Sequence, residues 1–250
     1  TPFPSDLRID ETGFVNIKDH PVPGTGIVGI DLTENVIKAV YEEMKGFSVA
    51  PSVIFRFTRK LDEKSLIPAD PAATNPSSNI FFVNLDTGKL VAFTADFKDA
   101  RNKYICSNWL VIQAIWGYAL HGNTQYGVYI TDGIRADAST GDDLIPKPGD
   151  DLPALLADKA PSDSFLKTAW DKHAKLREYL SGKKVNVAKV VAATVFTTQD
   201  PTRTMRQLRN AALAAEKPVI KSVVNCDDKA NAGKSAGGCA SLGAEKPAAG

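Results

Sequence analysis

The stretch of residues 125–131, QYGVYIT, constrains the fold of this chain more than any other segment. Tyr126, Val128 and Ile130 alternate with their neighbours, which is the period of a β-strand with one buried face. An Asp-Gly pair then turns the chain, and a second strand-like run follows at residues 190–198. We therefore expect residues 125–131 to form an edge strand of a small β-sandwich.

Further short segments with strand character are bounded by turn signals. They cover residues 52–58, 79–84, 89–93 and 109–115. The last of these is a continuous apolar run, which is consistent with burial on both faces. Several short strands with frequent turns favour a sandwich over alternating βαβ units. The expected fold class is mainly β, an antiparallel β-sandwich with helical insertions.

Three segments show the apolar spacing of helices. Residues 33–45 carry one apolar face, with Thr33 in the N-cap position and Gly46 after the last turn. Residues 162–180 carry the clearest apolar stripe, which includes Phe165 and His173, and residues 201–215 form the third helix. We expect the region at about 142–182 to be a loop-and-helix insertion between the last two strands.

The remaining segments lie on either side of the sandwich, which we place at residues 27–200. Residues 1–26 are expected to form an extended arm, with Phe3 and Leu7 able to dock on a surface. Residues 201–225 lead out through a helix and a strand-like run at 217–225. Residues 226–250 are a low-complexity segment typical of a loop or linker.

Charge and hydropathy exclude two classes of partner. The chain has 30 basic and 29 acidic residues and a net charge of +1, so it has no electrostatic footprint for nucleic acid. No apolar run reaches the length of a membrane span. The chain begins at Thr1 without an apolar signal segment, and we expect that a signal was removed or that the chain was cut from a longer protein.

Three cysteines are present. Cys106 follows Tyr104 and Ile105, and we expect it to be a buried, reduced thiol. Cys226 and Cys239 flank a polar Gly- and Ala-rich loop that has no core of its own. A disulfide between them suits an exported protein, and the alternative is two free thiols on a polar tail.

Residues 233–237 spell G-x-S-x-G, the nucleophile-elbow pattern of α/β-hydrolases. The elbow requires a strand directly before the serine and a helix after it. Polar residues precede Gly233, and no histidine follows Ser235 in the chain. We interpret the match as a coincidence, and we predict no catalytic residue in this chain.

The other chemistry-bearing residues give no compact motif. None of His20, His121 and His173 has a partner at metal-ligand spacing, so we expect packed or solvent-facing imidazoles. The acidic loops provide the best metal hypothesis, a weak Ca²⁺ site, although they lack EF-hand spacing. Its candidate ligands are Asp132, Asp137, Asp142 and Asp143. Trp109 and Trp116 bracket an apolar run, which favours core packing over ligand stacking.

Several segments together resemble a known family. They are PFPSDL at residues 2–7, Gly-Phe-Ser at 46–48 before a Phe-rich strand, LDEKSL at 61–66, the segment at 126–141, and TVFTTQDPTRTMRQ at 194–207. In these the chain is similar to the N-terminal bacterial Ig-like region of secreted lipase-like proteins, where it precedes an α/β-hydrolase domain. The resemblance implies an exported protein with an Ig-like fold and a catalytic serine outside this chain. The long helix at 33–45 and the Cys-bearing tail depart from the pattern.

Two functions follow as hypotheses. The first is a non-catalytic accessory module of a secreted lipase or esterase, which positions or presents a downstream catalytic domain. The second is a free-standing cell-surface binding or adhesion module. A hydrolase within this chain requires Ser235 to be catalytic and is the weakest hypothesis. No cofactor is expected beyond the weak Ca²⁺ site.

Overall fold

The computed structural model describes residues 2–19, 32–73, 75–101, 106–141 and 145–219. The chain divides into two compact units, Thr1–Thr202 and Arg203–Gly250, which are described separately. Cys226, Ser235 and Cys239 lie outside the described residues.

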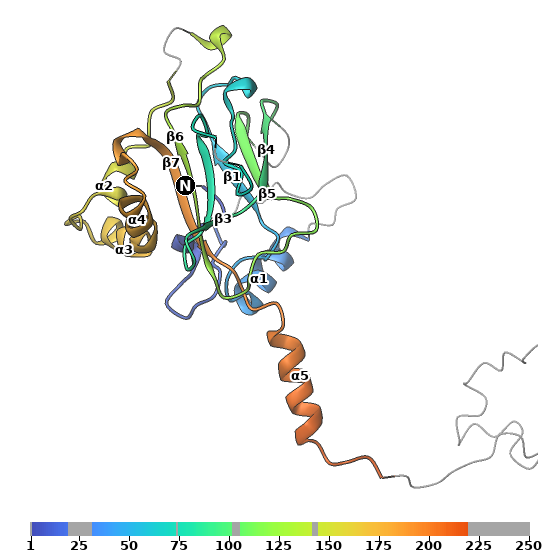
Figure 1. The fold of residues 1–250 in the computed structure, drawn as a ribbon. Coiled ribbons are helices and arrows are strands. Elements are labelled where there is room, and N and C mark those ends of the chain that lie inside the picture. The colour runs from blue at the N-terminus through green and yellow to red at the C-terminus, as the bar shows by residue number, and fades with distance from the viewer. Residues whose placement is uncertain (1, 20–31, 74, 102–105, 142–144, 220–250) are drawn as a thin grey trace, which may run out of the picture. The chain divides into compact units, whose positions relative to one another are not determined.

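Two antiparallel sheets form the centre of the first unit (Figure 1). The three-stranded sheet has the order β1-β5-β4, with β1 at Ser52–Arg56, β5 at Trp109–Ala114 and β4 at Phe93–Lys98. The four-stranded sheet has the order β3-β2-β6-β7, with β3 at Lys89–Leu90, β2 at Ile80–Asn84, β6 at Gln125–Thr131 and β7 at Val190–Thr197. Of these strands, only β4 falls largely outside the predicted segments.

The main hydrophobic core lies between the two sheets. Alternate residues of each strand point inward, so Phe55 and Ile112 from one sheet join Phe82, Val128 and Phe196 from the other. All five are at most 2% exposed. This pairing of faces confirms the predicted two-sheet antiparallel architecture.

The four-stranded sheet also packs on helices through its outer face. Helices α2 at Leu152–Leu156, α3 at Ser164–Lys172 and α4 at Ala174–Gly182 lie in the insertion between β6 and β7, as predicted. Leu176 and Leu180 of α4 join Tyr129 and Val195 of the sheet in a second apolar cluster. The molecule is therefore mixed α/β, with a helical layer over the sandwich, and the expectation of a mainly β fold underestimated this layer.

Two predictions about which strand faces are buried are wrong. Strand β6 is not an edge strand, because β2 and β7 pair with it on either side and helices cover its outer face. Its interior residues are therefore buried on both faces. Strand β5 alternates between buried and more exposed residues, so only one of its faces is buried.

The helix predicted over residues 162–180 is divided at His173. The backbone of His173 has φ −86° and ψ 5°, outside the helical range, so that α3 ends and α4 begins there. Phe165 was expected on the buried stripe, but it is 67% exposed.

The N-terminal segments pack on the sandwich. Phe3 makes an antiparallel bridge with Ile54 and an edge-to-face contact with Phe47, which confirms the predicted docking of the arm. Helix α1 at Thr33–Glu43 is also confirmed, although Leu32 occupies its N-cap. Among the described residues of this unit there are also four short 3₁₀ helices, at Asp6–Arg8, Glu63–Ser65, Ala138–Thr140 and Val187–Lys189.

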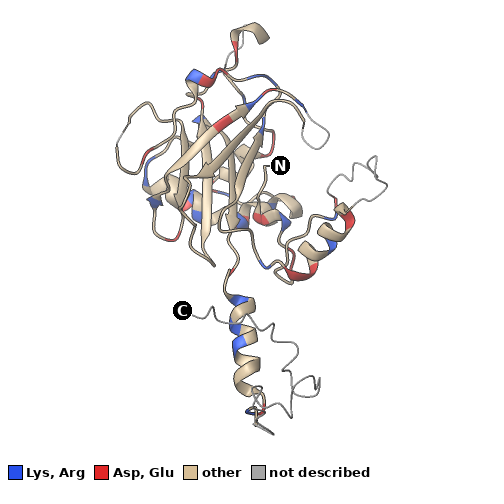
Figure 2. Ribbon diagram, turned by 90° about the vertical axis from the view of Figure 1, so that its right-hand side faces the viewer, with Lys and Arg blue, Asp and Glu red and all other residues tan. Residues whose placement is uncertain are grey.

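The second unit contains helix α5 at Arg203–Ala214, close to the predicted bounds. Figure 2 shows its basic residues, and none of its residues is buried. Residues 217–219 do not form the predicted strand, and the rest of that segment lies outside the described residues. Within the described part of the chain, no helix has the length and apolarity needed to cross a membrane.

Candidate ligand-binding cavity

A cavity of about 600 Å³ lies between the edge strands of the two sheets. Strand β1 is an edge of the three-stranded sheet and β7 is an edge of the four-stranded sheet. Residues 55–59, from the end of β1 onward, and residues 191–194 of β7 both line the cavity. Its volume is within the range of ligand sites, about 300–1,000 Å³.

The cavity has an apolar interior and a charged mouth. Its other walls come from the N-terminal arm, the loop before α2, and helices α2 and α3. The apolar lining includes Phe55, Leu61, Leu155, Leu166, Ala169 and Val191. Five charged residues of both signs complete the lining, namely Arg56, Arg59, Lys147, Asp150 and Asp151.

The N-terminal arm crosses from one sheet edge to the other. Phe3 exchanges two backbone hydrogen bonds with Ile54 of β1, of 3.1 and 2.6 Å. One residue later, the carbonyl of Pro4 accepts a hydrogen bond of 2.7 Å from the Thr194 hydroxyl of β7. The arm therefore bridges the two sheets beside the cavity.

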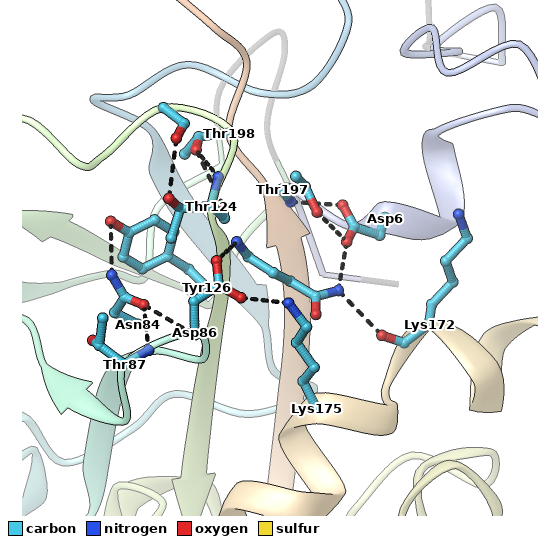
Figure 3. Close-up of polar contacts among 12 residues, drawn as sticks. Asp6, Asn84, Asp86, Thr87, Thr124, Tyr126, Lys172, Lys175, Thr197 and Thr198 are labelled. Carbon is cyan, nitrogen blue, oxygen red and sulfur yellow. Dashed lines mark hydrogen bonds and ion pairs between the residues drawn. The ribbon is translucent and has the colours of Figure 1, made fainter.

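A buried carboxylate fixes the arm to β7 (Figure 3). Asp6 is 3% exposed and accepts hydrogen bonds from the backbone N–H of Thr197 at 2.6 Å and from its hydroxyl at 2.8 Å. The Gln125 amide donates a third hydrogen bond, of 2.9 Å, and also reaches the carbonyl of Lys172 at 3.3 Å. Asp6 thus connects the arm, both C-terminal strands of the sheet and the end of α3.

The same close-up shows how neighbouring elements are joined (Figure 3). Lys175 of α4 forms an ion pair with Asp86 in the β2–β3 turn. Tyr126 of β6 accepts a hydrogen bond of 2.9 Å from the backbone N–H of His121 through its hydroxyl. Asn84 contributes a longer contact to this hydroxyl, at 3.5 Å.

His173 lines the cavity and is 2% exposed. Its pKa is lowered, chiefly because burial disfavours the charged imidazolium, with a smaller contribution from the positive charge of Arg177. The Nδ1 atom lies 2.7 Å from the carbonyl of Ala169, so it carries the proton and donates to that carbonyl. The neutral imidazole is therefore part of the cavity wall.

The predicted Ca²⁺ ligands do not form a site within the described residues. Asp137 caps a 3₁₀ helix by accepting from the backbone N–H of Ser139. The pKa of its carboxyl is lowered chiefly by a hydrogen bond with the Ser139 side chain and then by this backbone contact. Asp132 lies elsewhere, in the turn after β6, while Asp142 and Asp143 lie outside the described residues. The described residues include no group of three or more His, Cys, Asp or Glu side chains that could hold a metal ion.

Two predictions of burial are wrong. Cys106 is a free, exposed cysteine, because it precedes β5 and is not part of the strand. Trp116 is 99% exposed. It lies at the tip of a tight turn, in which Tyr118 donates to the carbonyl of Ile115 at 3.1 Å and Gly117 has φ +82°.

Sequence reasoning did not find the cavity or Asp6. The cavity lining comes from several distant parts of the chain, none of which has a motif of its own. The Asp6 contacts span 119 residues to Gln125 and 191 residues to Thr197, so local spacing carries no signal for them. The bond between Tyr126 and His121 spans only five residues. A local sequence feature accompanies it, namely an aromatic residue just after a Gly-containing turn.

No known protein-family model matches the chain, and no curated protein shows significant similarity to it.

Proposed function

We propose that residues 1–202 form an Ig-like module that acts by binding a ligand in the cavity between β1 and β7. The cavity is the single observation that carries the binding role. It combines a concave apolar interior with a few charged groups at its mouth, which is the usual character of a ligand site.

The strand order supports the Ig-like assignment. In Ig-like sandwiches, strands B, E and D lie side by side in one sheet, and C′, C, F and G in the other. The orders β1-β5-β4 and β3-β2-β6-β7 follow this arrangement when β1 is taken as B and β7 as G. The bridge between Phe3 and Ile54 then has the place of the pairing between strands A and B.

The contact of Tyr126 supports the same assignment. Ig-like domains often carry a tyrosine near the start of strand F, whose hydroxyl bonds to the backbone a few residues upstream. Tyr126 is the second residue of β6, the strand that corresponds to F, and its hydroxyl bonds to His121.

The sequence resemblance adds a proposed context for this binding module. In that context the module is an exported accessory to a lipase or esterase domain and presents that domain or attaches it to a surface component. The alternative context, a free-standing adhesion module, uses the same cavity. Both contexts are proposals that rest on the segments at residues 2–7, 46–48, 61–66, 126–141 and 194–207.

Binding of an apolar fluorescent probe tests the proposed site. We expect anilinonaphthalene sulfonate to bind the folded chain saturably at one site. Ala192 lines the cavity, so Ala192→Phe fills part of it and should weaken binding roughly tenfold or more, about 1.4 kcal/mol. Ala119→Phe introduces the same side chain at an exposed position outside the lining and should leave the affinity unchanged.

The measurement is a fluorescence titration, with near-ultraviolet circular dichroism to show that each variant keeps its tertiary packing. Equal affinity in the Ala192→Phe and Ala119→Phe variants would place the probe elsewhere and would refute the proposed function.

A further inference from the structure

We infer that the natural occupant of the cavity is an extended segment of a partner polypeptide, which pairs with the backbone of the sheet edges. This inference rests on the proposed function and specifies its ligand class. It is carried by the direction of the backbone hydrogen-bonding groups on β1 and β7.

On β1, the backbone groups of Arg56 point away from its sheet. Ile54 pairs outward with Phe3, whereas the N–H of Phe57 bonds inward to the carbonyl of Asn108 at 2.8 Å. Because outward and inward groups alternate along an antiparallel edge, the N–H and C=O of Arg56 point outward like those of Ile54. Within the described residues these groups have no hydrogen-bond partner, and Arg56 lines the cavity.

On β7, the same reasoning applies to Ala193. The N–H of Thr197 points outward to Asp6, while the N–H of Thr198 bonds inward to Thr124 at 3.0 Å. Two-residue alternation places the N–H and C=O of Ala193 on the outward side with Thr197. In the described part of the chain they too have no partner, and Ala193 lines the same cavity.

The described residues of the N-terminal arm, 2–19, cover only part of these edges. They satisfy Ile54 on β1 and Thr197 on β7, and among the described residues Arg56 and Ala193 keep outward backbone groups without a partner. Unpaired edges of this kind are templates for an added strand, and peptide recognition by strand addition uses them. A small apolar molecule would fill the cavity but would not satisfy these donors and acceptors.

The charges at the mouth complement a peptide that carries both signs. Arg56 and Arg59 lie on the β1 side, whereas the loop before α2 carries Asp150 and Asp151 and one lysine, Lys147, and is therefore acidic on balance. An occupant with alternating apolar residues, an acidic residue toward β1 and a basic residue toward α2 matches both groups. A second copy of this chain and a small molecule are the competing occupants.

Selection from a displayed library of random heptapeptides tests the inference on the full chain. We expect enrichment of peptides with an apolar residue at every second position. A selected peptide should lose at least tenfold in affinity when alternate backbone nitrogens are methylated on its pairing edge, since methylation removes donors and keeps the side chains. Methylation on the opposite edge is the matched control and should have little effect.

Variants at Arg56 distinguish the contribution of its backbone N–H to peptide binding from the contribution of its side chain. Its N–H faces outward on an edge strand, so proline can replace it without loss of a bond to β5. We expect Arg56→Pro to weaken the selected peptide at least tenfold, and Arg56→Ala to weaken it less. Amide exchange should slow at Arg56 and Ala193 when the peptide is bound.

Three other outcomes of these experiments would contradict the inference that a partner peptide pairs with the strand edges. A peptide that binds equally well with either edge methylated occupies the cavity without strand pairing. Failure to enrich any peptide, with the fluorescent probe still bound in the cavity, overturns strand addition and leaves the proposed function intact. Concentration-dependent dimerisation that protects the same amides assigns the edges to a second copy of the chain.

Discussion

At the scale of single residues, His173 has three structural roles. It ends α3, begins α4 and forms part of the cavity wall. Its ring donates to Ala169 within the same turn, and this local bond is compatible with the break in the helix. The sequence placed His173 on the apolar stripe correctly, but the stripe alone carries no information about a break, because buried residues continue on both sides of it.

The buried imidazole predicts a pH dependence of stability. Burial lowers the pKa of His173 in the folded state, so the unfolded chain binds a proton first as the pH falls. The free energy of unfolding should therefore decrease below about pH 6.5, the ordinary value for histidine, until the pH reaches the lowered pKa. The contribution is at most about 1.4 kcal/mol per pH unit.

Urea denaturation between neutral and mildly acidic pH measures this effect. The His173→Gln variant has no titrating ring at this position and should show a smaller loss of stability over the same range. An identical pH slope in the two proteins would show that His173 does not contribute.

At the scale of elements, the central position of β6 depends on a glycine. A Cβ atom at Gly127 would lie 3.1 Å from Leu176 of α4 and 3.2 Å from Leu85, which is closer than normal side-chain packing. The glycine therefore lets the helical layer approach the sheet. The alternation of residues 125–131 predicted the strand correctly but not its outer neighbours, because a helix inserted later in the chain provides them.

Replacement of this glycine should destabilise the protein. We expect Gly127→Val to reduce the free energy of unfolding by about 1–3 kcal/mol through overpacking against Leu176. Gly149→Val is the control, since a Cβ atom there meets nothing within 4 Å. The double variant Gly127→Val with Leu176→Ala should lose less free energy of unfolding than the two single variants lose together, because the smaller residue makes room for valine. Strict additivity in urea denaturation would contradict this packing account.

At the scale of the whole molecule, the two compact units differ in how they are stabilised. The unit of residues 1–202 has two apolar clusters, whereas α5 has no buried residue. The sequence predicted most strands and helices of the larger unit because each has its own local periodicity. It did not predict the cavity, because the arm, the end of β1, the loop before α2 and β7 meet only in the folded chain.

Removal of residues 203–250 tests the independence of the larger unit. We expect the shortened chain to retain its free energy of unfolding within about 0.5 kcal/mol, as is usual for changes that affect no buried group. Removal of β7 as well, by deletion of residues 190–250, should prevent cooperative unfolding, because this strand contributes to both apolar clusters. A loss of more than about 1 kcal/mol in the first deletion would show that α5 or the residues after it support the sandwich.

The bond between Asp6 and Thr197 has a consequence for synthesis on the ribosome. The two residues are 191 positions apart, so the segment around Asp6 is synthesised long before β7 and must wait for that strand before it reaches its native partner. Until then the nascent chain exposes β1 without a complete cover, and exposed strand edges favour aggregation. Vectorial folding of residues 1–202 therefore cannot be complete before β7 binds the arm around Asp6, and a chaperone would be most useful during that interval.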